Sequence, residues 1–558
     1  MLSVPRRAAC VYGPLLAAAV LAIFMTWPLA RDLGSVARTG VRAGDARFGT
    51  NADGMFSLWN VSWVARTLFE DPRNLFNANI FHPAKNSLAF SEPNLVAGLI
   101  GAPVWKLTGN PYATLNFVIL VAFAAAWYFA WLLVRHLTGS SEAGVIAGVL
   151  FAFCPYVFAH TAHIQLMLTA GIPAALLALH RVADDPSMRR GVVLGLAILV
   201  QGLACAYYGI FSVVLVGYSV LFLSASRRLW RSASWWMALG SAVAIAGIGA
   251  LPFFSHFSDI RAEGFGRTLH ESAAFSANAA SYLASSAYAH AWLLRRIASW
   301  PAWREVMFPG FLTLGLALAG GLLAVAAGRA SGARRERETA LLYGTAGIFA
   351  CWASFGPAGG FYTLLFELPF FAFLRAPARF AIVVVLALVV LGSLATRRLL
   401  LASGTRRQWV AAALTLLAIA ELATAMPWER AVRLPLPYRS LAQMPPAPIA
   451  EFPFYSRRPY MHAQYMLYST SHWMPLLNGY SDHLPARFRE NALNLESFPS
   501  DRSFATLRGL GVRYVGVHWD RYGARAADVR QRLLIYKRYL QPIALGDRTE
   551  IYEIVAFP

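Results

Sequence analysis

The sequence has few cysteines and few charged residues for its length. Only 4 cysteines occur among 558 residues, with no CxxC spacing and each inside or beside an apolar stretch. This pattern argues against a disulfide framework and against a cysteine-based zinc site. Charged residues make up 14% of the chain, whereas hydrophobic residues make up 57%. Such a composition is unusual for soluble domains and predicts an α-helical polytopic membrane protein.

Acidic residues are scarcer than basic ones, with 28 Asp and Glu against 49 Lys and Arg, and the formal net charge is +21. Nucleic-acid-binding proteins also have a basic excess. Here, however, the arginines form short runs between apolar segments, as the positive-inside rule expects of cytoplasmic loops. We therefore expect the bilayer, and no nucleic acid, as a partner. The apolar run after Arg6 and Arg7 continues to Ala30 without a small-residue cleavage site, which indicates a retained first span rather than a signal peptide.

Long apolar runs recur along the chain, and about 20 such residues cross the roughly 30 Å hydrocarbon core of a bilayer. On this rule we predict about 11 spans. They lie at 11–30, 111–134, 142–160, 163–181, 190–206, 207–226, 235–255, 306–328, 338–355, 376–396 and 407–426. The least certain boundary is the short break Ala206–Gly209 between two of them, because merging that pair would invert every later orientation.

Arginine clusters at every second boundary predict the orientation of the spans. The N-terminus is then cytoplasmic and the C-terminus extracytoplasmic. The clusters are Arg6 and Arg7; Arg135; Arg181, Arg189 and Arg190; Arg227, Arg228 and Arg231; Arg329, Arg334, Arg335 and Arg337; and Arg397, Arg398, Arg406 and Arg407.

The composition becomes proline-rich and polar after about Pro427, with short alternating stretches such as PIAEFPF and GVRYVGVHW. We therefore predict a membrane domain over residues 1–426, with large outer loops at 31–110 and 256–305. Residues 427–558 are predicted to form a small extracytoplasmic α/β domain. No catalytic signature occurs in that domain, and packing over the membrane domain is the simpler role for it.

Two carboxylates, Asp45 and Asp53, lie in the loop after the first span, in GDARFGTNADGMFSLWNVSW. Leu58, Val61 and Ala65 follow Asp53 at helical spacing. We expect a helix along the membrane surface with Asp53 at its N-cap. A carboxylate there can meet a substrate with a lipid tail and a polar head. The alternative is that Asp53 only caps the helix and Asp45 only solvates a loop.

Three further polar groups lie on the predicted outer face, where charged side chains near the membrane are candidates for function. IFHPAKNSLAFSE contains His82, Lys85 and Glu92, and CPYVFAHTAHIQL contains His160, His163 and Gln165. The two histidines of the second group suit a metal site by spacing, but a hydrogen-bonded interfacial pair is the commoner arrangement.

The third group is FLRAPARF, in which Arg375 and Arg379 flank a proline at the outer end of a span. Arginines at this end break the charge rule that the rest of the chain obeys. A guanidinium forms bidentate bonds with phosphate, which makes a phosphate site the functional interpretation. Anchoring to lipid headgroups by snorkelling is the alternative.

The order of these motifs, followed by AEFPF, LLNGY and LRGLGVRYVGVH, resembles the bacterial multi-spanning C-type glycosyltransferase (GT-C) superfamily. The chain is most similar to an uncharacterised branch related to polyprenyl-phosphate-sugar-dependent mannosyl and lipid A-sugar transferases. The resemblance covers nearly the whole chain. It implies transfer of a sugar from a polyprenyl-phosphate donor to a lipid, glycan or protein acceptor on the outer side of the membrane.

The resemblance also implies that an acidic residue of the first outer loop acts as base or metal ligand. By this resemblance Asp53 is the first candidate for that role, and Asp45 is the second. In many members the acidic residues form a tight pair, whereas here they are eight positions apart. This departure leaves open which aspartate is the base and whether the two hold a divalent cation such as Mg²⁺ or Mn²⁺.

Ordinary chemistry agrees with these roles, because inverting glycosyl transfer needs a base for the acceptor hydroxyl and stabilisation of the departing phosphate. Arg375 and Arg379 suit the phosphate. The remaining polar and aromatic candidates are expected to line the sugar pocket, although aromatic residues at such depths also form interfacial belts. They are His82, Glu92, His160, His163, Gln165, Trp59, Tyr207 and Tyr208.

Two other classes of protein remain open beside the enzyme. A lipid or sugar transporter would have inverted repeats and polar residues near the centres of its spans, and neither is evident. A non-catalytic protein with this fold, serving envelope glycan assembly, would keep the same motifs. Assignment by fold alone does not separate it from an active transferase.

Overall fold

The computed structural model describes residues 4–38, 51–257, 260, 266–297, 305–326, 334–368 and 371–558. The chain forms two compact units. Unit 1 comprises Met1–Asp32, Phe117–Phe254 and Gly266–Pro427, and unit 2 comprises Leu33–Asn116, Ser255–Phe265 and Trp428–Pro558. This grouping differs from the predicted division after residue 426, because most of the first outer loop belongs to the same unit as the C-terminal residues.

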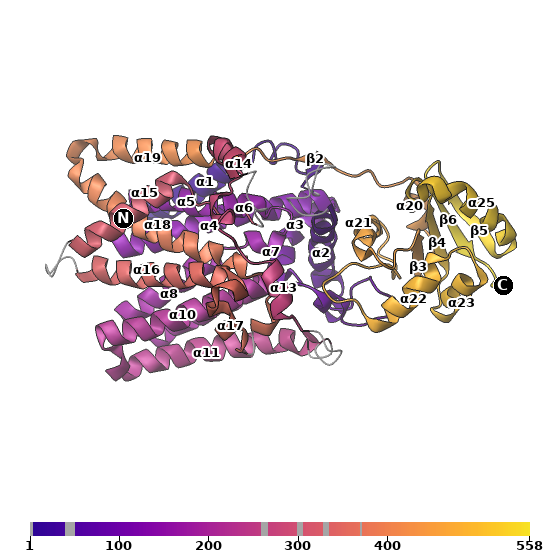
Figure 1. The fold of residues 1–558 in the computed structure, drawn as a ribbon, viewed down its shortest axis with the longest axis horizontal. Coiled ribbons are helices and arrows are strands. Elements are labelled where there is room, and N and C mark those ends of the chain that lie inside the picture. The colour runs from indigo at the N-terminus through magenta and orange to yellow at the C-terminus, as the bar shows by residue number, and fades with distance from the viewer. Residues whose placement is uncertain are drawn as a thin grey trace. The chain divides into compact units, whose positions relative to one another are not determined.

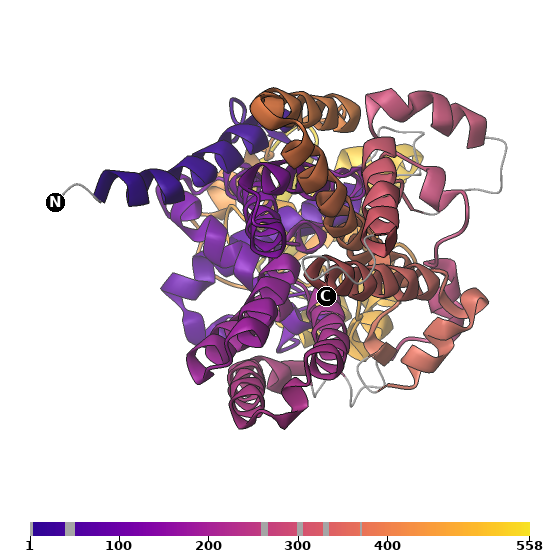
Figure 2. The ribbon, with the colours of Figure 1, turned by 90° about the vertical axis from the view of Figure 1, so that its left-hand side faces the viewer.

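Unit 1 is a bundle of α-helices, seen from the side in Figure 1 and along the bundle in Figure 2. Helices follow the apolar runs because hydrocarbon offers the backbone no other hydrogen-bond partners. They are α1 (Val4–Met25), α4 (Pro111–Thr138, which begins in unit 2), α5 (Ser141–Ala152), α6 (Pro155–Ala159), α7 (Ile164–Met167), α8 (Gly171–Asp184), α9 (Met188–Ala204), α10 (Ala206–Arg227), α11 (Ala233–Phe254), α13 (Leu269–Ala274), α14 (Ala291–Ile297), α15 (Phe311–Ala326), α16 (Arg334–Ser354), α17 (Phe361–Phe366), α18 (Ala381–Ala402) and α19 (Arg407–Leu422).

Each predicted span corresponds to helix in the structure, but the helices differ in length and composition. Among the described residues, 6 segments are long and apolar enough to cross a membrane. They are Pro111–Thr138, Ser141–Ala159, Ile164–Asp184, Ala206–Arg227, Ala233–Phe257 and Pro377–Ala402. Tyr12–Met25 and Phe311–Ala326 are apolar but shorter. The protein is thus a helical membrane protein, and the count of about 11 spans stays a prediction.

The doubtful boundary between the fifth and sixth predicted spans is a real break. Helix α9 ends at Ala204, and α10 begins at Ala206. Cys205 between them is extended, with φ −159° and ψ 116°. The two helices pack against each other, and a side chain at Gly209 would meet the backbone of Gly202. The pair therefore forms a helical hairpin, with the break one residue before the predicted one.

Glycines allow close helix packing in unit 1, where apolar surface alone gives little drive for association within a bilayer. A Cβ at Gly191 or Gly195 of α9 would collide with backbone of α11, at Ala238 and Ala242. A Cβ at Gly320 of α15 would likewise collide with a backbone carbonyl of α18. Small residues thus set the approach of these two helix pairs.

Ion pairs join helix ends that the arginine clusters predict to be cytoplasmic. Arg227 at the end of α10 lies 2.8 Å from Asp184 and 2.5 Å from Glu338, which belong to α8 and α16. Arg398 of α18 lies 2.6 Å from Glu336 at the start of α16. These ends therefore gather at one end of unit 1, as alternating spans require.

Unit 2 contains a mixed four-stranded sheet in the order β3-β4-β6-β5. Strands β3 (Ile449–Phe452) and β4 (Tyr514–His518) are parallel, whereas β6 (Thr549–Ile554) runs antiparallel to both β4 and β5 (Leu540–Leu545). A second, small sheet pairs β1 (Val36–Ala37) with β2 (Glu429–Arg430). The helices of unit 2 are α2 (Asn51–Glu70), α3 (Leu95–Thr108), α20 (Pro437–Leu441), α21 (Ala463–Ser469), α22 (Ala486–Glu496), α23 (Asp501–Gly509), α24 (Trp519–Tyr522) and α25 (Ala526–Ile535).

Backbone hydrogen bonds join the first outer loop to the C-terminal residues within unit 2. The N–H of Leu476 donates to the carbonyl of Asn79 at 2.9 Å, and the N–H of His82 donates to the carbonyl of Leu476 at 3.0 Å. Helix α21 packs on α2 in the same unit. Because of these contacts, a separate α/β domain over residues 427–558 stays a prediction.

A buried polar network holds the sheet of unit 2. The carboxylate of Glu451 accepts a 2.8 Å hydrogen bond from Tyr438 and lies 2.9 Å from Nε2 of His518. All three residues are at most 2% exposed. A buried carboxylate is tolerated when its oxygens are bonded in this way. Gly516 of β4 leaves room for it, because a Cβ there would overlap the Glu451 carboxylate.

Candidate functional site

Asp53 lies in the first turn of α2, as its third residue, rather than at the N-cap that the sequence predicted. Its Oδ1 accepts a 2.8 Å hydrogen bond from the hydroxyl of Tyr480. The Tyr480 ring also packs edge-on against Phe56, with centroids 6.0 Å apart. Unsatisfied N–H groups and the helix dipole favour a carboxylate in this turn. Both the helix and the tyrosine therefore orient the Asp53 carboxylate.

Asp45 lies outside the described residues. In the part of the chain that the structure describes, no three His, Cys, Asp or Glu side chains come together as metal ligands. Asp53 with a tyrosine hydroxyl is not by itself a divalent-cation site, which normally needs several oxygen ligands. A cation held by Asp45 and Asp53 stays a prediction, and the roles below do not depend on it.

Trp59 is a core residue of unit 2, which corrects its predicted role. Its Nε1 donates a 2.9 Å hydrogen bond to Asn79, and the residue is 1% exposed. Its ring therefore has no open face for a sugar. The sequence pattern did not distinguish this position from an interfacial one, because Trp fits both places.

Glu92 is held against α2, two helical turns from Asp53. The side chain of Asn60 donates a 3.2 Å hydrogen bond to the backbone carbonyl of Glu92. Asn60 follows Asp53 by seven residues, so the two lie on one face of α2, about 10.5 Å apart along its axis. The structure thus places Glu92 along the same helix face as the candidate base.

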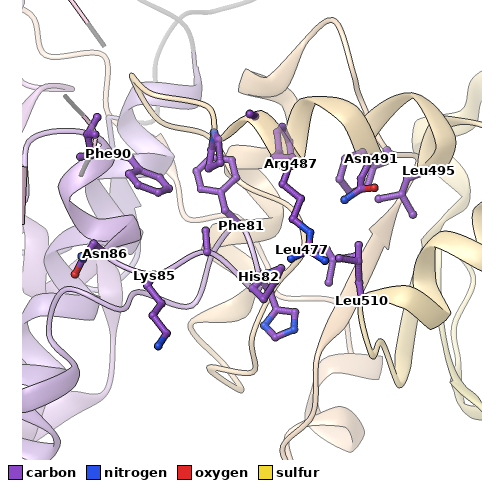
Figure 3. Close-up of a pocket in the computed structure, with 17 residues that line it drawn as sticks. Phe81, His82, Lys85, Asn86, Phe90, Leu477, Arg487, Asn491, Leu495 and Leu510 are labelled. Atoms are coloured by element: carbon purple, nitrogen blue, oxygen red, sulfur yellow. The ribbon is translucent and has the colours of Figure 1, made fainter. Parts of the chain in front are cut away.

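His82 lines a cavity of about 360 Å³ in unit 2, shown in Figure 3. Burial lowers the pKa of His82, a hydrogen bond to the backbone of Leu510 opposes this, and the positive charge of Arg487 lowers it further. The imidazole is therefore neutral at pH 7 in the absence of a bound anion. Lys85, from the same loop, also lines this cavity.

Tyr207 joins the two candidate phosphate-binding arginines in unit 1. Its hydroxyl accepts a 2.9 Å hydrogen bond from the backbone N–H of Arg375. Its ring lies under the guanidinium of Arg379, 4.0 Å from the ring centroid. The Arg375 guanidinium lies 5.1 Å from the ring of Phe275. Tyr207 belongs to the first turn of α10, and Arg379 to the 3-10 helix η10 (Pro377–Phe380) that precedes α18.

Arg379 forms no ion pair with any carboxylate in the described ranges. A guanidinium placed over an aromatic ring interacts with the ring through its face. Its N–H groups, which lie in the guanidinium plane, remain available for an anion. An arginine that the protein leaves without a counterion in a half-buried position is costly unless a ligand or solvent compensates it. The arrangement therefore fits an arginine that receives an external phosphate.

His160 and His163 lie near a carboxylate that belongs to a different segment of unit 1. Nε2 of His160 is 3.5 Å from Glu305, and Nδ1 of His160 is 2.7 Å from the carbonyl of Tyr156. Burial by itself would raise the pKa of Glu305, but His160 lowers it, and the charges of Arg379 and His163 lower it further. Glu305 is therefore ionised at neutral pH, close to Arg379 without pairing with it.

Tyr208 and Gln165 contribute differently from what the sequence predicted. Tyr208 is 0% exposed, and its hydroxyl bonds that of Tyr156 at 3.2 Å and the carbonyl of Leu166 at 3.2 Å. It therefore fixes the start of α10 against α6 and α7 and does not offer a face to a sugar. Gln165 is partly exposed in α7, and its side chain has no hydrogen bond to a described residue.

Glu305 and Tyr480 are the two site residues that the sequence analysis missed. Glu305 is a lone carboxylate immediately before an apolar run, so its position was a usable signal. Tyr480 ends the motif LLNGY, but nothing in the sequence relates it to Asp53, from which it is separated by 427 positions. The predicted residues thus fall into two groups, with Asp53, Glu92 and His82 in unit 2 and the arginines with Tyr207 and His160 in unit 1.

The fold matches that of solved membrane transferases. The structure of ArnT from Cupriavidus metallidurans bound to undecaprenyl phosphate matches with a TM-score of 0.50 at 14% identity, covering 98% of this chain and 99% of that one. The apo form of the same protein gives a TM-score of 0.49 at 14% identity, with 98% of each chain covered. The archaeal oligosaccharyltransferase AglB from Archaeoglobus fulgidus, in complex with an inhibitory peptide and a dolichol-phosphate, gives 0.46 at 14% identity, covering 95% of this chain and 72% of that one.

The fold that the resemblance to the GT-C superfamily implied is therefore confirmed by the match to ArnT. No curated protein matches the sequence. A family described as a domain of unknown function, DUF6311, matches residues 67–423, which include every candidate of unit 1 and the loop that bears His82 and Glu92. Since this match spans more than half of the chain, the protein belongs to the DUF6311 family.

Proposed function

We propose that this protein is an integral membrane glycosyltransferase that moves a sugar from a polyprenyl-phosphate donor to an envelope lipid, glycan or protein acceptor. The observation that carries the proposal is the Asp53 carboxylate, oriented by Tyr480 at 2.8 Å. It occurs in a chain whose fold matches a transferase bound to undecaprenyl phosphate over nearly its full length. We place the reaction on the outer side of a bacterial inner membrane, with the N-terminus cytoplasmic and the C-terminal residues outside.

Asp53 is proposed as the general base. It takes the proton of the acceptor hydroxyl as the oxygen attacks the anomeric carbon, and the bond from that carbon to the phosphate oxygen breaks. The hydrogen bond from Tyr480 holds the carboxylate in one orientation, which reduces the entropy lost in reaching the attacking geometry.

Arg375 and Arg379 are proposed to bind the donor phosphate. Charge accumulates on the phosphate as it departs, so a fixed guanidinium stabilises the transition state more than the ground state. Tyr207 contacts both arginines. Its hydroxyl accepts the backbone N–H of Arg375, and its ring packs under the guanidinium of Arg379. The ionised Glu305 nearby is proposed to hold His160 and His163 toward the sugar rather than to pair with Arg379.

The test is transfer of radiolabelled sugar from a panel of polyprenyl-phosphate sugars into lipid, glycan and protein fractions, for wild type and Asp53→Asn. The asparagine can still accept the bond from Tyr480 but cannot take a proton, so we expect transfer to fall by about 10²- to 10⁴-fold. Asp528→Asn is the matched control, because Asp528 is an exposed carboxylate of α25 paired with Arg532.

Wild-type transfer that survives in Asp53→Asn would remove Asp53 from the role of base. If the wild type transferred no sugar from any donor while binding polyprenyl phosphate in a manner that requires Arg375, the non-catalytic alternative would replace the enzyme. Thermal unfolding of each variant in detergent separates loss of chemistry from loss of fold.

A further inference from the structure

The cavity around His82 is built from three segments of unit 2. The loop around the cis peptide His82–Pro83 forms one wall and helix α22 forms another. The third wall consists of single residues from other parts of unit 2, among them Leu477 and Leu510. Its volume of about 360 Å³ lies at the lower end of the range for small-molecule sites. The cavity thus has room for one small ligand and not for a lipid chain or a folded partner.

The described residues of the lining are basic and include no carboxylate. Lys85 and Arg487 are the charged residues among the 17 that line it, and His82, Asn86 and Asn491 add neutral polar groups. Neither Lys85 nor Arg487 forms an ion pair with a residue of the described ranges. In Figure 3 the Arg487 side chain extends from α22 toward His82, and the charge of Arg487 lowers the pKa of that imidazole. Among the described residues that line it, the cavity therefore carries a net positive charge.

Aromatic side chains give the cavity rigid walls. The Phe81 ring packs edge-on against Phe488 at 4.9 Å and lies 5.8 Å from Phe90. Phe81 has a left-handed backbone, with φ 58°, which is costly for a bulky residue. Its N–H donates to the carbonyl of Asn478 at 3.3 Å, which helps to hold this conformation. Strain retained at a cavity wall is consistent with a shape fixed in advance for a ligand.

The cavity is connected to the candidate base through one short segment. Leu477 lines the cavity, and Tyr480, three residues later, donates to Asp53. Three residues span at most about 11 Å, so the cavity wall and the partner of Asp53 are close. Gly479 between them lies against the Phe81 ring, because a Cβ there would stand 2.5 Å from that ring.

We propose that this cavity binds a negatively charged monosaccharide unit of the acceptor, one that bears a carboxylate or a phosphate. Arg487 and Lys85 pair with the anionic group, as charge-assisted bonds to carboxylate and phosphate are strong. The Asn491 amide provides a donor and an acceptor for ring hydroxyls, and the phenylalanines pack on the apolar face of the ring. The inference rests on the proposed transferase function, since it names the acceptor class that the Asp53 site uses.

The test measures binding of three soluble probes to the full-length protein in nanodiscs, by isothermal titration calorimetry. The probes are glucuronate, glucose 6-phosphate and neutral glucose. We expect at least one anionic probe to bind more tightly than glucose. We also expect Arg487→Gln to raise its Kd at least about tenfold, the order of one lost charge-assisted pair. Arg489→Gln is the matched control, because it removes the same charge from the same helix outside the cavity lining.

Equal binding of glucose and both anions, or no binding of any probe, would overturn the proposal. So would equal loss of affinity in Arg487→Gln and Arg489→Gln, because that result means a general effect of net charge. If Arg487→Gln failed to fold, Lys85→Gln takes its place with the same expectation. Asp53→Asn should keep anion binding in this proposal. If the wild type bound the anionic probe but transferred no sugar from any donor, that result would count against the proposed function and not against the cavity.

Discussion

Arginines at the two ends of unit 1 have different kinds of partner. At the predicted cytoplasmic end, Arg227 contacts carboxylates of two other helices, at 2.8 and 2.5 Å. At the other end, Arg379 lies over the Tyr207 ring at 4.0 Å and pairs with no described carboxylate. Glu305 is nevertheless near enough for the charge of Arg379 to lower the pKa of its carboxyl group. Arg227 therefore has a structural role, since its carboxylate partners join it to two other helices. No carboxylate of the described ranges pairs with Arg379, which is the arrangement expected of an arginine that binds an anion from outside the chain.

This difference also explains why the charge rule fails locally. Basic residues on cytoplasmic loops direct insertion of the spans, and here several of them also join helices. Arg379, at the predicted outer end, forms no ion pair with a described carboxylate, so ion pairing between helices does not account for it and a different advantage is needed to retain it. Phosphate binding supplies one, because a guanidinium offers paired donors in the geometry of a phosphate.

The largest effect should come from Arg379→Ala. Loss of the guanidinium removes stabilisation of the departing phosphate, and we expect sugar transfer to fall by about 10²- to 10³-fold. Arg379→Lys should recover only part of the rate, because lysine keeps the charge without the bidentate fork. Arg407→Gln, which removes the partner of Glu142 at the other end, is the control and should leave the transfer rate near that of wild type. Equal losses in both would remove the distinction between the two ends.

The second effect concerns stability at the predicted cytoplasmic end. Glu338→Gln takes one carboxylate from Arg227, whose side chain is only 20% exposed. We expect a loss of about 1–3 kcal/mol in the free energy of unfolding, because a half-buried charge then has one partner fewer. Thermal unfolding in detergent measures it, and the transfer rate at low temperature should stay unchanged. A large fall in transfer with unchanged unfolding would show that this end also serves the chemistry.

A smaller effect is expected from Tyr207→Phe. The ring stays under Arg379, but the hydroxyl that accepts the N–H of Arg375 is lost. An unmade hydrogen bond of this kind costs about 1–2 kcal/mol, so transfer should fall by about tenfold. Tyr218→Phe is the matched control, because Tyr218 lies on α10 like Tyr207 and its hydroxyl bonds that of Thr345 on α16. Unchanged transfer in Tyr207→Phe would mean that only the ring of Tyr207 matters.

The smallest effect is a pH dependence at the outer end. The pKa of Glu305 is lowered below its ordinary value of 4.5 by His160, Arg379 and His163 against the effect of burial. Ionised Glu305 therefore adds stability above pH 4.5, and this contribution is lost as the pH falls through the lower, folded-state pKa. Because the side chain is 23% exposed, we expect less than about 1 kcal/mol. Glu305→Gln should lack this component of acid sensitivity, and an identical pH profile would contradict it.

The sequence predicted the helical elements well because apolar length and arginine placement are local properties. The break between α9 and α10 is an example, since a polar-aromatic interruption was visible and the structure has extended backbone at Cys205. Arg375 and Arg379 were also found locally, as exceptions to a charge rule. The number of spans was less accessible, because α9, α15 and α19 are short and only their packing makes them part of the bundle.

Side-chain surroundings were not accessible in the same way. Trp59 and Tyr208 were expected to face a sugar, and both are buried with hydrogen bonds to residues of the core. Aromatic residues satisfy the same sequence pattern in a core, at an interface or in a binding site. Only the location of their partners distinguishes these places.

By itself, the sequence determined that this chain is a helical membrane protein with acidic and basic candidates near the predicted outer ends of its spans. Hydropathy and charge act over one segment at a time, so they can be read without knowing the fold. The tertiary structure decided which candidates have partners. Tyr480 reaches Asp53 across 427 positions, and Glu305 reaches His160 from another segment. Such pairings depend on how distant segments pack, and no local property of either segment records them.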